Sequence, residues 1–200
     1  IEGVRVGVIR HFHRNDMIAH PAVDGCIEAA LGVLSSLGAT VEEVTTRPLA
    51  EFSDGNRVIL LSEGYAVHER WMQTRPADYA EMTRQKLLPG AFLRASDYVQ
   101  AIRNRAGFTS AIDSLLDRVD VLVAASSMDP PFPINDSELV ARCYPRQARA
   151  PFNLTGHPAL SVPGGYFEDD GEPALPLSFQ LIGRHFDEAT LYRVAAAYEE

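Results

Sequence analysis

The segment that most restricts the fold is a continuous apolar run, residues 121–125, which directly follows Asp120. Five apolar residues between a charge and a pair of serines are typical of a strand buried on both faces. Such strands belong to α/β proteins, where helices cover both faces of the sheet. The following loop contains Pro130, Pro131 and Pro133 and is therefore irregular. It leaves the strand at the end where α/β proteins usually place their ligands.

The first forty residues predict a strand, a helix and a second strand. Residues 4–9 are mostly β-branched and read as a strand, and residues 40–44 read as another. Between them, Pro21 suits the first turn of a helix, apolar residues recur at helical spacing, and Gly38 ends the pattern. Two strands joined through a helix pair in parallel.

The rest of the chain predicts long helices and then a hairpin. Helical patterns cover residues 52–73 and 95–119, and a last helix begins after Asp187. Residues 159–163 and 177–182 read as strands that form an antiparallel hairpin. A polar turn around residues 169–171 would connect these two strands. We therefore expect residues 1–200 to form one α/β unit, with a mixed parallel and antiparallel sheet flanked by helices.

Composition narrows the function classes. The chain has 18 Lys and Arg against 27 Asp and Glu, a net charge of -9, which disfavours phosphate backbones and anionic membrane surfaces as partners. Cys26 and Cys143 are too few for a disulfide framework, so a reducing compartment, the cytoplasm, is expected. We find no apolar stretch of 18 residues and no signal-peptide pattern, and expect no membrane anchor.

Metal chemistry has one sequence candidate, the histidines that follow the first strand. On an extended segment, His11 and His13 would point the same way, and Asp16 could serve as a third ligand. The alternative is a group of surface histidines on a loop. Because we find no second histidine cluster, we favour that alternative and expect neither a metal nor another cofactor.

Nucleophilic catalysis has weak candidates. Ser126 and Ser127 end the buried strand, but the chain has no Gly-x-Ser-x-Gly segment, and serines at strand ends commonly form turns. Lys86 is the only lysine, and its polar helical surroundings do not favour the loss of its proton. The other histidines are isolated in the sequence, and we interpret each as a structural or surface residue; they include His68, His157 and His185.

Three ordered motifs near the end of the chain carry a family resemblance. They are APFNLTGHPALSVP at 150–163, LPLSFQLIGR at 175–184 and FDEATL at 186–191. Together they resemble the C-terminal end of amidase-signature enzymes. Upstream segments agree, among them GVRVGV at 3–8 and LGATV at 37–41. The resemblance covers essentially the whole chain.

The resemblance implies an amide hydrolase or amidotransferase whose Ser, cis-Ser and Lys triad lies outside this chain. In that family the triad serines stand in glycine-rich segments, whereas here Gly164 and Gly165 precede Tyr166. The pair Ser126 and Ser127 has no flanking glycines. We therefore expect that the chain is the C-terminal part of the enzyme and contains no catalytic residue. We also expect no activity from this part alone.

The resemblance also implies positions that face a small amide substrate. The loop that begins with Ser126, Ser127 and Met128 should do so, as should the approach to Asn153. Some relatives bind a substrate carboxylate in the region of Arg84 and Lys86, although a solvated helix face is the alternative. Glutamine-using relatives carry a carboxylate seven residues before the asparagine, where this chain has Arg146. This difference disfavours a component of an ammonia-donating tRNA amidotransferase.

Two other hypotheses stay open at this stage. One is a non-catalytic binding or assembly module that keeps the fold. The other is a metal-dependent hydrolase built around His11 and His13. For any partial domain, open strand edges and bare apolar faces favour association, so we expect the chain to associate with itself.

Overall fold

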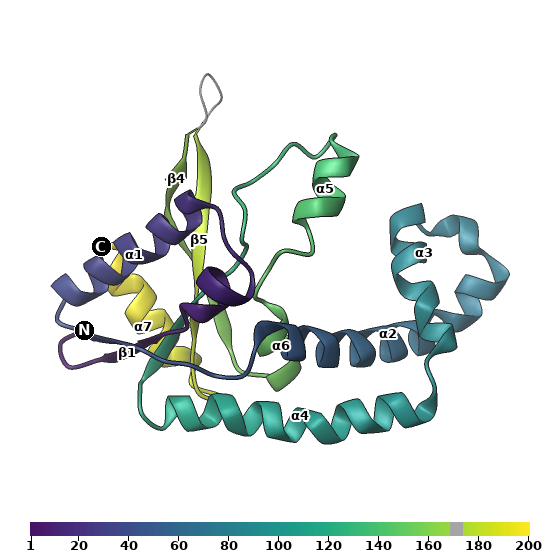
Figure 1. Cartoon of the computed structure of the whole chain (residues 1–200), viewed down its shortest axis with the longest axis horizontal. Helices are drawn as coiled ribbons and strands as arrows, with labels where there is room; N and C mark the ends of the chain where they lie inside the picture. The colour runs from purple at the N-terminus through teal and green to yellow at the C-terminus, as the bar shows by residue number, and fades with distance from the viewer. Residues whose placement is uncertain (169–173) are drawn as a thin grey trace.

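The computed structural model describes residues 1–168 and 174–200. It contains a five-stranded sheet with helices packed around it (Figure 1). The predicted turn around residues 169–171 lies outside the described residues.

The sheet has the strand order β2-β1-β3-β5-β4. Its bounds are β1 Arg5–Val8, β2 Thr40–Glu43, β3 Val121–Ala125, β4 Ala159–Phe167 and β5 Leu175–Ile182. β1 pairs in parallel with both β2 and β3, whereas β5 pairs antiparallel with β3 and β4. The predicted α/β class with a mixed sheet is therefore confirmed.

β3 is the central strand of the sheet, and it is buried on both faces, as its sequence predicted. All five of its residues are buried. Its neighbours are a parallel strand on one side and an antiparallel strand on the other, and both of its faces are covered. Asp120, the residue before it, accepts hydrogen bonds from the backbone and the guanidinium of Arg5 and so joins the starts of β1 and β3.

Seven α-helices are described: α1 Pro21–Ser36, α2 Leu49–Thr74, α3 Glu81–Leu87, α4 Ala95–Leu116, α5 Ser137–Cys143, α6 Ala150–Thr155 and α7 Glu188–Glu199. Pro21 is the first residue of α1, and Gly38, with φ +92°, makes the turn after it. The helical segment expected around Arg84 and Lys86 corresponds to α3, whereas α5 and α6 have no counterpart in the sequence predictions. They are six or seven residues long, too short to show a period.

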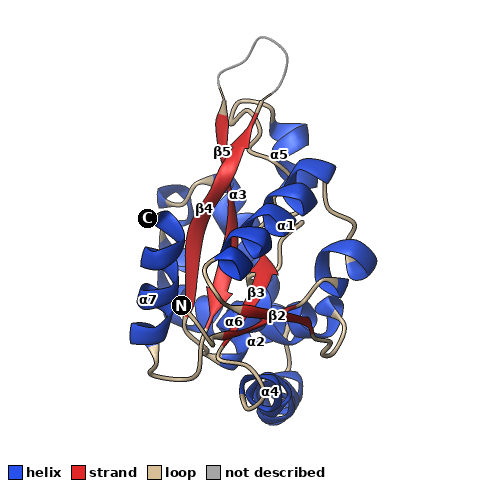
Figure 2. Ribbon diagram, turned by 90° about the vertical axis from the view of Figure 1, so that its left-hand side faces the viewer, coloured by secondary structure: helices blue, strands red, loops and turns tan. Residues whose placement is uncertain are grey.

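Helices α1 and α7 contact each other and the β4–β5 hairpin, and they cover one face of the sheet there (Figure 2). α1 buries Ile27, Ala30 and Leu34 against the strands. α2, α4 and α6 pack on one another at the lower end of the sheet in Figure 1. Phe52 of α2 and Phe108 of α4 meet there, with ring centroids 4.9 Å apart.

The α2 and α4 helices extend beyond the sheet as a pair, with α3 at their far end (Figure 1). Few side chains of this arm are buried. In α2 the buried residues are Leu49, Phe52 and Met72. Apolar side chains along it stay exposed, including Leu60, Val67 and Phe92. Across residues 1–168 and 174–200, none of the helices has the length and apolar character needed to cross a membrane.

Candidate functional site

The end of β3 leads into a tightly held segment. Ser126 and Ser127 are half-buried and Met128 is fully buried. The Met128 backbone accepts a hydrogen bond from His20 N (2.7 Å) and donates one to Arg146 O (3.0 Å). Ser127 pairs with Gln147 in an isolated antiparallel bridge. The segment is therefore fixed from two sides, by the start of α1 and by the residues that precede α6.

A small cavity of 150 Å³ opens beside this segment. Its lining comes from α1, from the proline-rich loop and from β5, and includes Val23, Ser127, Asp129, Pro130, Phe132 and Ser178. The Ser127 hydroxyl donates to the Asp129 carbonyl at 3.1 Å and accepts from the Asp129 amide at 3.4 Å. Of the site residues expected from the sequence, Ser127 is the one that lines this cavity. Met128 anchors the segment with a side chain that is 0% exposed.

Arg146 and Asp129 form an ion pair at the rim of the same segment. Arg146 Nε donates to Asp129 Oδ2 at 2.7 Å, and its Nη2 donates to the Ile18 carbonyl at 2.6 Å. One guanidinium thus joins the proline-rich loop to the segment before α1. The family resemblance led us to expect a carboxylate at this position in glutamine-using enzymes, and in this chain the position holds a paired cation.

Arg84 and Lys86 lie on α3 rather than at the cavity. Arg84 Nη1 is 3.5 Å from the Pro76 carbonyl. The Lys86 ammonium stands 3.9 Å from the centroid of the Tyr144 ring, just after α5. This cation-π contact brings α3 to the end of α5. Neither residue is among those that line the cavity beside Ser127.

Asn153 lies on α6 and its side chain is exposed. The helix itself is well anchored, because Phe152, Leu154 and Thr155 are buried. Near the same place the Gln180 amide donates to the carbonyls of Ala125 (2.7 Å) and Ala148 (3.2 Å). The segment before α6 is thereby fixed to the end of β3, while Asn153 does not line the cavity.

The expectation that His11 and His13 share one direction is wrong. The segment is not extended: residues Phe12–Asp16 form a π-helical turn, so alternate side chains diverge. His11 Nδ1 is 3.1 Å from Asp16 Oδ2, and His11 Nε2 accepts from the Thr46 amide. His13 is buried and faces Asp24 at 3.3 Å, and burial lowers its pKa. The histidines therefore take separate structural roles.

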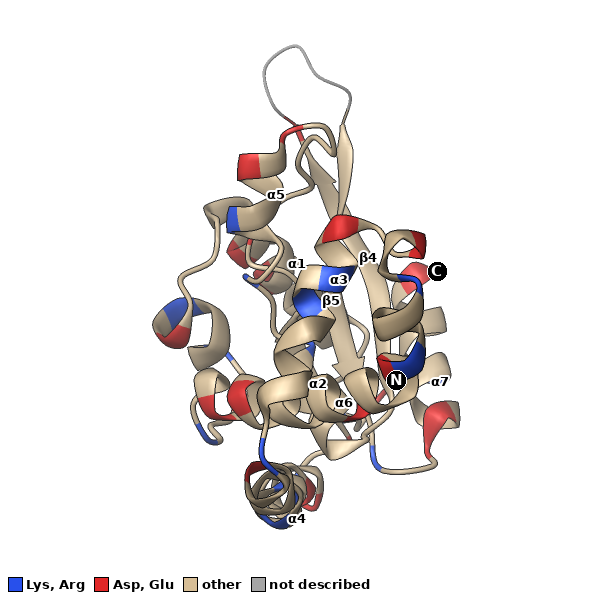
Figure 3. Ribbon diagram, turned by 90° about the vertical axis from the view of Figure 1, so that its right-hand side faces the viewer, with Lys and Arg blue, Asp and Glu red and all other residues tan. Residues whose placement is uncertain are grey.

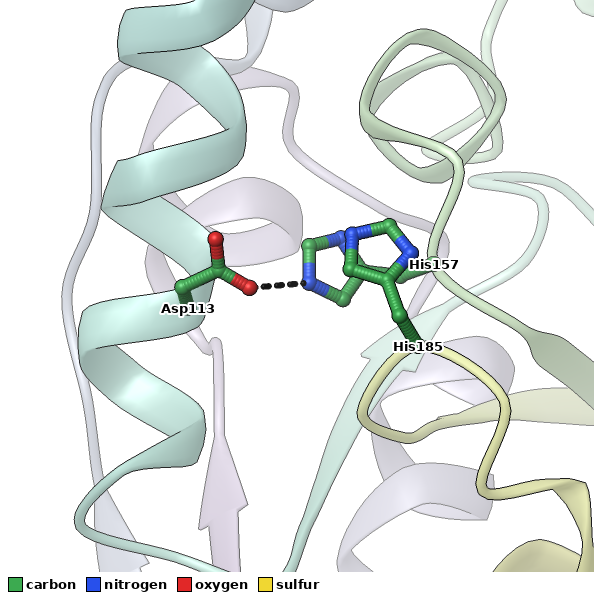
Figure 4. A group of neighbouring side chains, drawn as sticks. All are labelled: Asp113, His157 and His185. Carbon is green, nitrogen blue, oxygen red and sulfur yellow. Dashed lines mark hydrogen bonds and ion pairs between the residues drawn. The ribbon is translucent and has the colours of Figure 1, made fainter.

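A different group of metal-ligand residues meets elsewhere, and no pattern in the chain indicated it (Figure 4). Asp113 comes from α4, His157 from the turn between α6 and β4, and His185 from the turn between β5 and α7. One ligand atom from each lies within 4.8 Å of the other two. Sequence reasoning treated both histidines as isolated, because 28 and 44 positions separate residues that only the fold brings together.

His157 is the buried member of this group, and it is held at both ring nitrogens. Nδ1 lies 2.9 Å from Thr155 Oγ1, and Nε2 lies 3.1 Å from Asp113 Oδ1. Burial lowers the pKa of His157, and the nearby Asp113 carboxylate opposes that effect. The His185 ring stacks on it, with centroids 4.0 Å apart. A cavity of 500 Å³ adjoins Asp113, Thr155 and His185.

Charged side chains elsewhere are mixed in sign. Figure 3 shows acidic and basic segments interspersed over the helices that face the viewer. Several are paired, for example Arg10 with Glu28 at 2.7 Å and Arg14 with Asp24 at 2.6 Å.

Comparison with known proteins identifies relatives by sequence. The family model described as Amidase matches residues 2–192. The chain is 32% identical to a glutamyl-tRNA(Gln) amidotransferase subunit of Chloroflexus aggregans, in an alignment that covers all of this chain and 44% of that protein. The corresponding protein of Exiguobacterium sibiricum is 28% identical, with 45% of it covered. The chain thus spans less than half the length of these relatives, which agrees with the expectation of a C-terminal portion.

Solved structures have the same fold. An amidase crystal structure matches with a TM-score of 0.82 at 22% identity, over 100% of this chain and 46% of that one. A bacterial aryl acylamidase of the amidase-signature family matches with a TM-score of 0.75 at 20% identity, over 100% and 44% of the two chains. Because the family model covers nearly every residue, the chain belongs to the amidase family.

Proposed function

We propose that this chain is the C-terminal part of an enzyme that hydrolyses the C–N bond of a small carboxamide. The observation that carries the proposal is the family match over residues 2–192, in a chain that spans less than half of its relatives. The rest of the domain would supply the attacking serine, the bridging serine and lysine that relay its proton, and the amides that stabilise the oxyanion. The serine oxygen would bond to the acyl carbon, the amine would leave with a proton, and water would then hydrolyse the acyl-enzyme ester.

The contribution of this chain would be a rigid wall for the acyl pocket. The segment that begins with Ser126 lies at the end of a fully buried strand and is hydrogen-bonded on two sides. A wall built this way keeps its shape when substrate binds, as positioning a reacting group requires. Two polar residues of the segment border the cavity, and because Asp129 is paired with Arg146, we assign the substrate-facing role to Ser127.

Arg146 separates this proposal from a glutamine-using function. The name of the Chloroflexus aggregans relative describes part of a tRNA amidotransferase. Recognition of the ammonium group of glutamine requires an anionic side chain, whereas Arg146 is a cation paired with Asp129. We therefore propose a substrate other than glutamine.

The first experiment assays a panel of simple amides and esters, with glutamine included. The chain is tested alone and together with the remaining part of the enzyme. We expect turnover only when both parts are present, and none with glutamine. Turnover by this chain alone would refute the proposal that the triad lies elsewhere, and efficient use of glutamine would refute the role given to Arg146.

Variants of the assembled enzyme test the two serines. Ser127→Ala should change the KM or the kcat for amides, because its hydroxyl borders the cavity. Ser126→Ala is the matched control: it removes the same group from the neighbouring residue, which does not line the cavity. Equal effects of the two substitutions would contradict the assignment of Ser127 to the wall of the acyl pocket.

Lys86 and Arg84 are proposed to bind a carboxylate carried by the substrate. Lys86→Met should raise the KM for a carboxylate-bearing amide about 10- to 100-fold, the cost of losing a hydrogen bond to a charged group. It should leave a neutral amide of the same size unaffected. A uniform loss on both substrates would mean that the contact of Lys86 with Tyr144 has only a structural role.

Assembly is the second part of the proposal. The arm of α2, α3 and α4 exposes Val67 (70%) and Phe92 (81%), and strands β2 and β4 form the two edges of the described sheet. We propose that the isolated chain associates with itself through these surfaces. A monomer in light scattering at all salt concentrations would refute this.

The free cysteines Cys26 and Cys143, both buried, support a reducing compartment, the cytoplasm.

A further inference from the structure

Asp113, His157 and His185 each offer one candidate metal-ligand atom, and these three atoms lie within 4.8 Å of one another (Figure 4). Zinc binds histidine nitrogen and carboxylate oxygen at about 2.0–2.2 Å, so two ligand atoms in tetrahedral geometry are about 3.3 Å apart. His157 Nε2 and Asp113 Oδ1 are 3.1 Å apart, close to that spacing. His185 is exposed, so its ring can rotate the remaining distance without disturbing the core.

The buried histidine is oriented in the way that metal-ligating histidines are. A ligating imidazole normally bonds a protein oxygen through its second nitrogen, which fixes the ring and the tautomer. Here Thr155 Oγ1 lies 2.9 Å from Nδ1, which directs Nε2 at Asp113. Without a metal, Nε2–H donates to the carboxylate. With a metal, the proton resides on Nδ1 and bonds Thr155, so the imidazole stays neutral and no net proton is lost.

Asp113 and His185, but not His157, line the adjoining 500 Å³ cavity, together with Arg105 and Thr155. A metal there would have three protein ligands and a fourth position open to water, as in zinc sites that keep one coordination position open. Arg105 lines the same cavity. Its guanidinium lies beside the turn at Gly156, because Nη2 is 3.5 Å from the position that a Cβ on Gly156 would occupy. Its charge offsets that of Asp113. A hard cation held mainly by charge is therefore disfavoured, whereas a metal that bonds imidazole is not.

We propose that Asp113, His157 and His185 form a binding site for Zn²⁺ or a similar borderline transition-metal ion. The ion would fasten α4 to the two turns that flank the β4–β5 hairpin. This site is separate from the cavity beside Ser127 and does not depend on the proposed amide hydrolysis.

The test is equilibrium dialysis of the metal-stripped protein against zinc chloride, with magnesium and calcium chloride in parallel. We expect one zinc ion per chain and no binding of magnesium or calcium at the same concentration. His185→Ala should weaken zinc binding by more than the about 10- to 100-fold that loss of an outer-shell partner costs, and Asp113→Asn should also weaken it. Both side chains are exposed, so the variants should keep the wild-type circular dichroism spectrum.

Two matched variants make the test specific. Arg105→Met removes a cation from the same cavity and should tighten zinc binding. His11→Gln removes a histidine that also pairs with an aspartate, and should leave zinc binding unchanged. Absence of zinc binding by the wild-type protein would overturn the proposal. Binding that His185→Ala leaves intact, or that His11→Gln abolishes, would overturn it equally.

Discussion

The carboxylate of Asp120 offers the sharpest test of how the sheet is held together. It lies directly before β3 and accepts three hydrogen bonds from Arg5, at 2.9, 3.2 and 2.9 Å. Arg184 adds a second cation 3.6 Å away. The bonds from the Arg5 side chain, more than any other cause, lower the pKa of Asp120 from 3.8 to about 2. Replacement with Asn removes the charge but keeps the shape.

The size of the effect follows from that pKa. A carboxylate with a lower pKa in the folded protein than in the unfolded chain stabilises the fold fully above the unfolded pKa of 3.8. The stabilisation is lost as the pH falls towards the folded value of about 2. At about 1.4 kcal/mol per pKa unit this amounts to about 2.4 kcal/mol near neutral pH. Solvent around the half-exposed Arg5 side chain screens the pair, so we expect a measured loss of about 1–2 kcal/mol.

Urea unfolding of the wild type and of Asp120→Asn, followed by circular dichroism at several pH values, measures this difference. The difference in the free energy of unfolding between the two proteins should be largest at neutral pH, about half as large near pH 3, and close to zero near pH 2. Asp117→Asn is the control, because it removes an exposed carboxylate three residues away and should cost about 0.5 kcal/mol or less. A difference in the free energy of unfolding that does not change with pH would refute the electrostatic reasoning. It would mean that the lost stability comes from packing.

Four further substitutions test packing and turns by the same unfolding assay. Gly164→Ala would place a Cβ in steric overlap with the Cys26 sulfur and 3.2 Å from the Phe179 ring, so it should destabilise by about 1–3 kcal/mol. An unchanged unfolding midpoint would contradict the close contact between the hairpin and α1. Gln180→Leu leaves the carbonyls of Ala125 and Ala148 without their donor and should cost about 1–3 kcal/mol, whereas a neutral result would contradict the anchoring of the segment before α6. Gly32 lies inside α1 with open space around it, so Gly32→Ala should stabilise the fold by about 0.5–1 kcal/mol. Gly38→Ala should instead destabilise it, because Gly38 has a φ of +92° and Glu2 lies 3.0 Å from the new Cβ. Stability changes of the same sign in the two variants would refute this prediction.

The family assignment came from short motifs that the sequence contains in full. Residues 150–163 combine a buried helix, the turn at Gly156 and the start of β4, so their residue types are dictated locally by burial and by a left-handed φ. The strands and long helices were predictable for a related reason. The apolar run of β3 and the helical spacing of α1 are local patterns, and burial acts on each of them directly.

Short helices and side-chain groupings depended on the tertiary structure. The π-helical turn after β1 separated His11 from His13, although their spacing had suggested a shared direction. Conversely, Asp113, His157 and His185 come from one helix and two turns, and only the tertiary structure, in which α4 packs against α6, brings them together. A sequence records which donor atoms a chain carries. Their distances depend on how separate elements pack, and packing is decided by contacts between residues far apart along the chain.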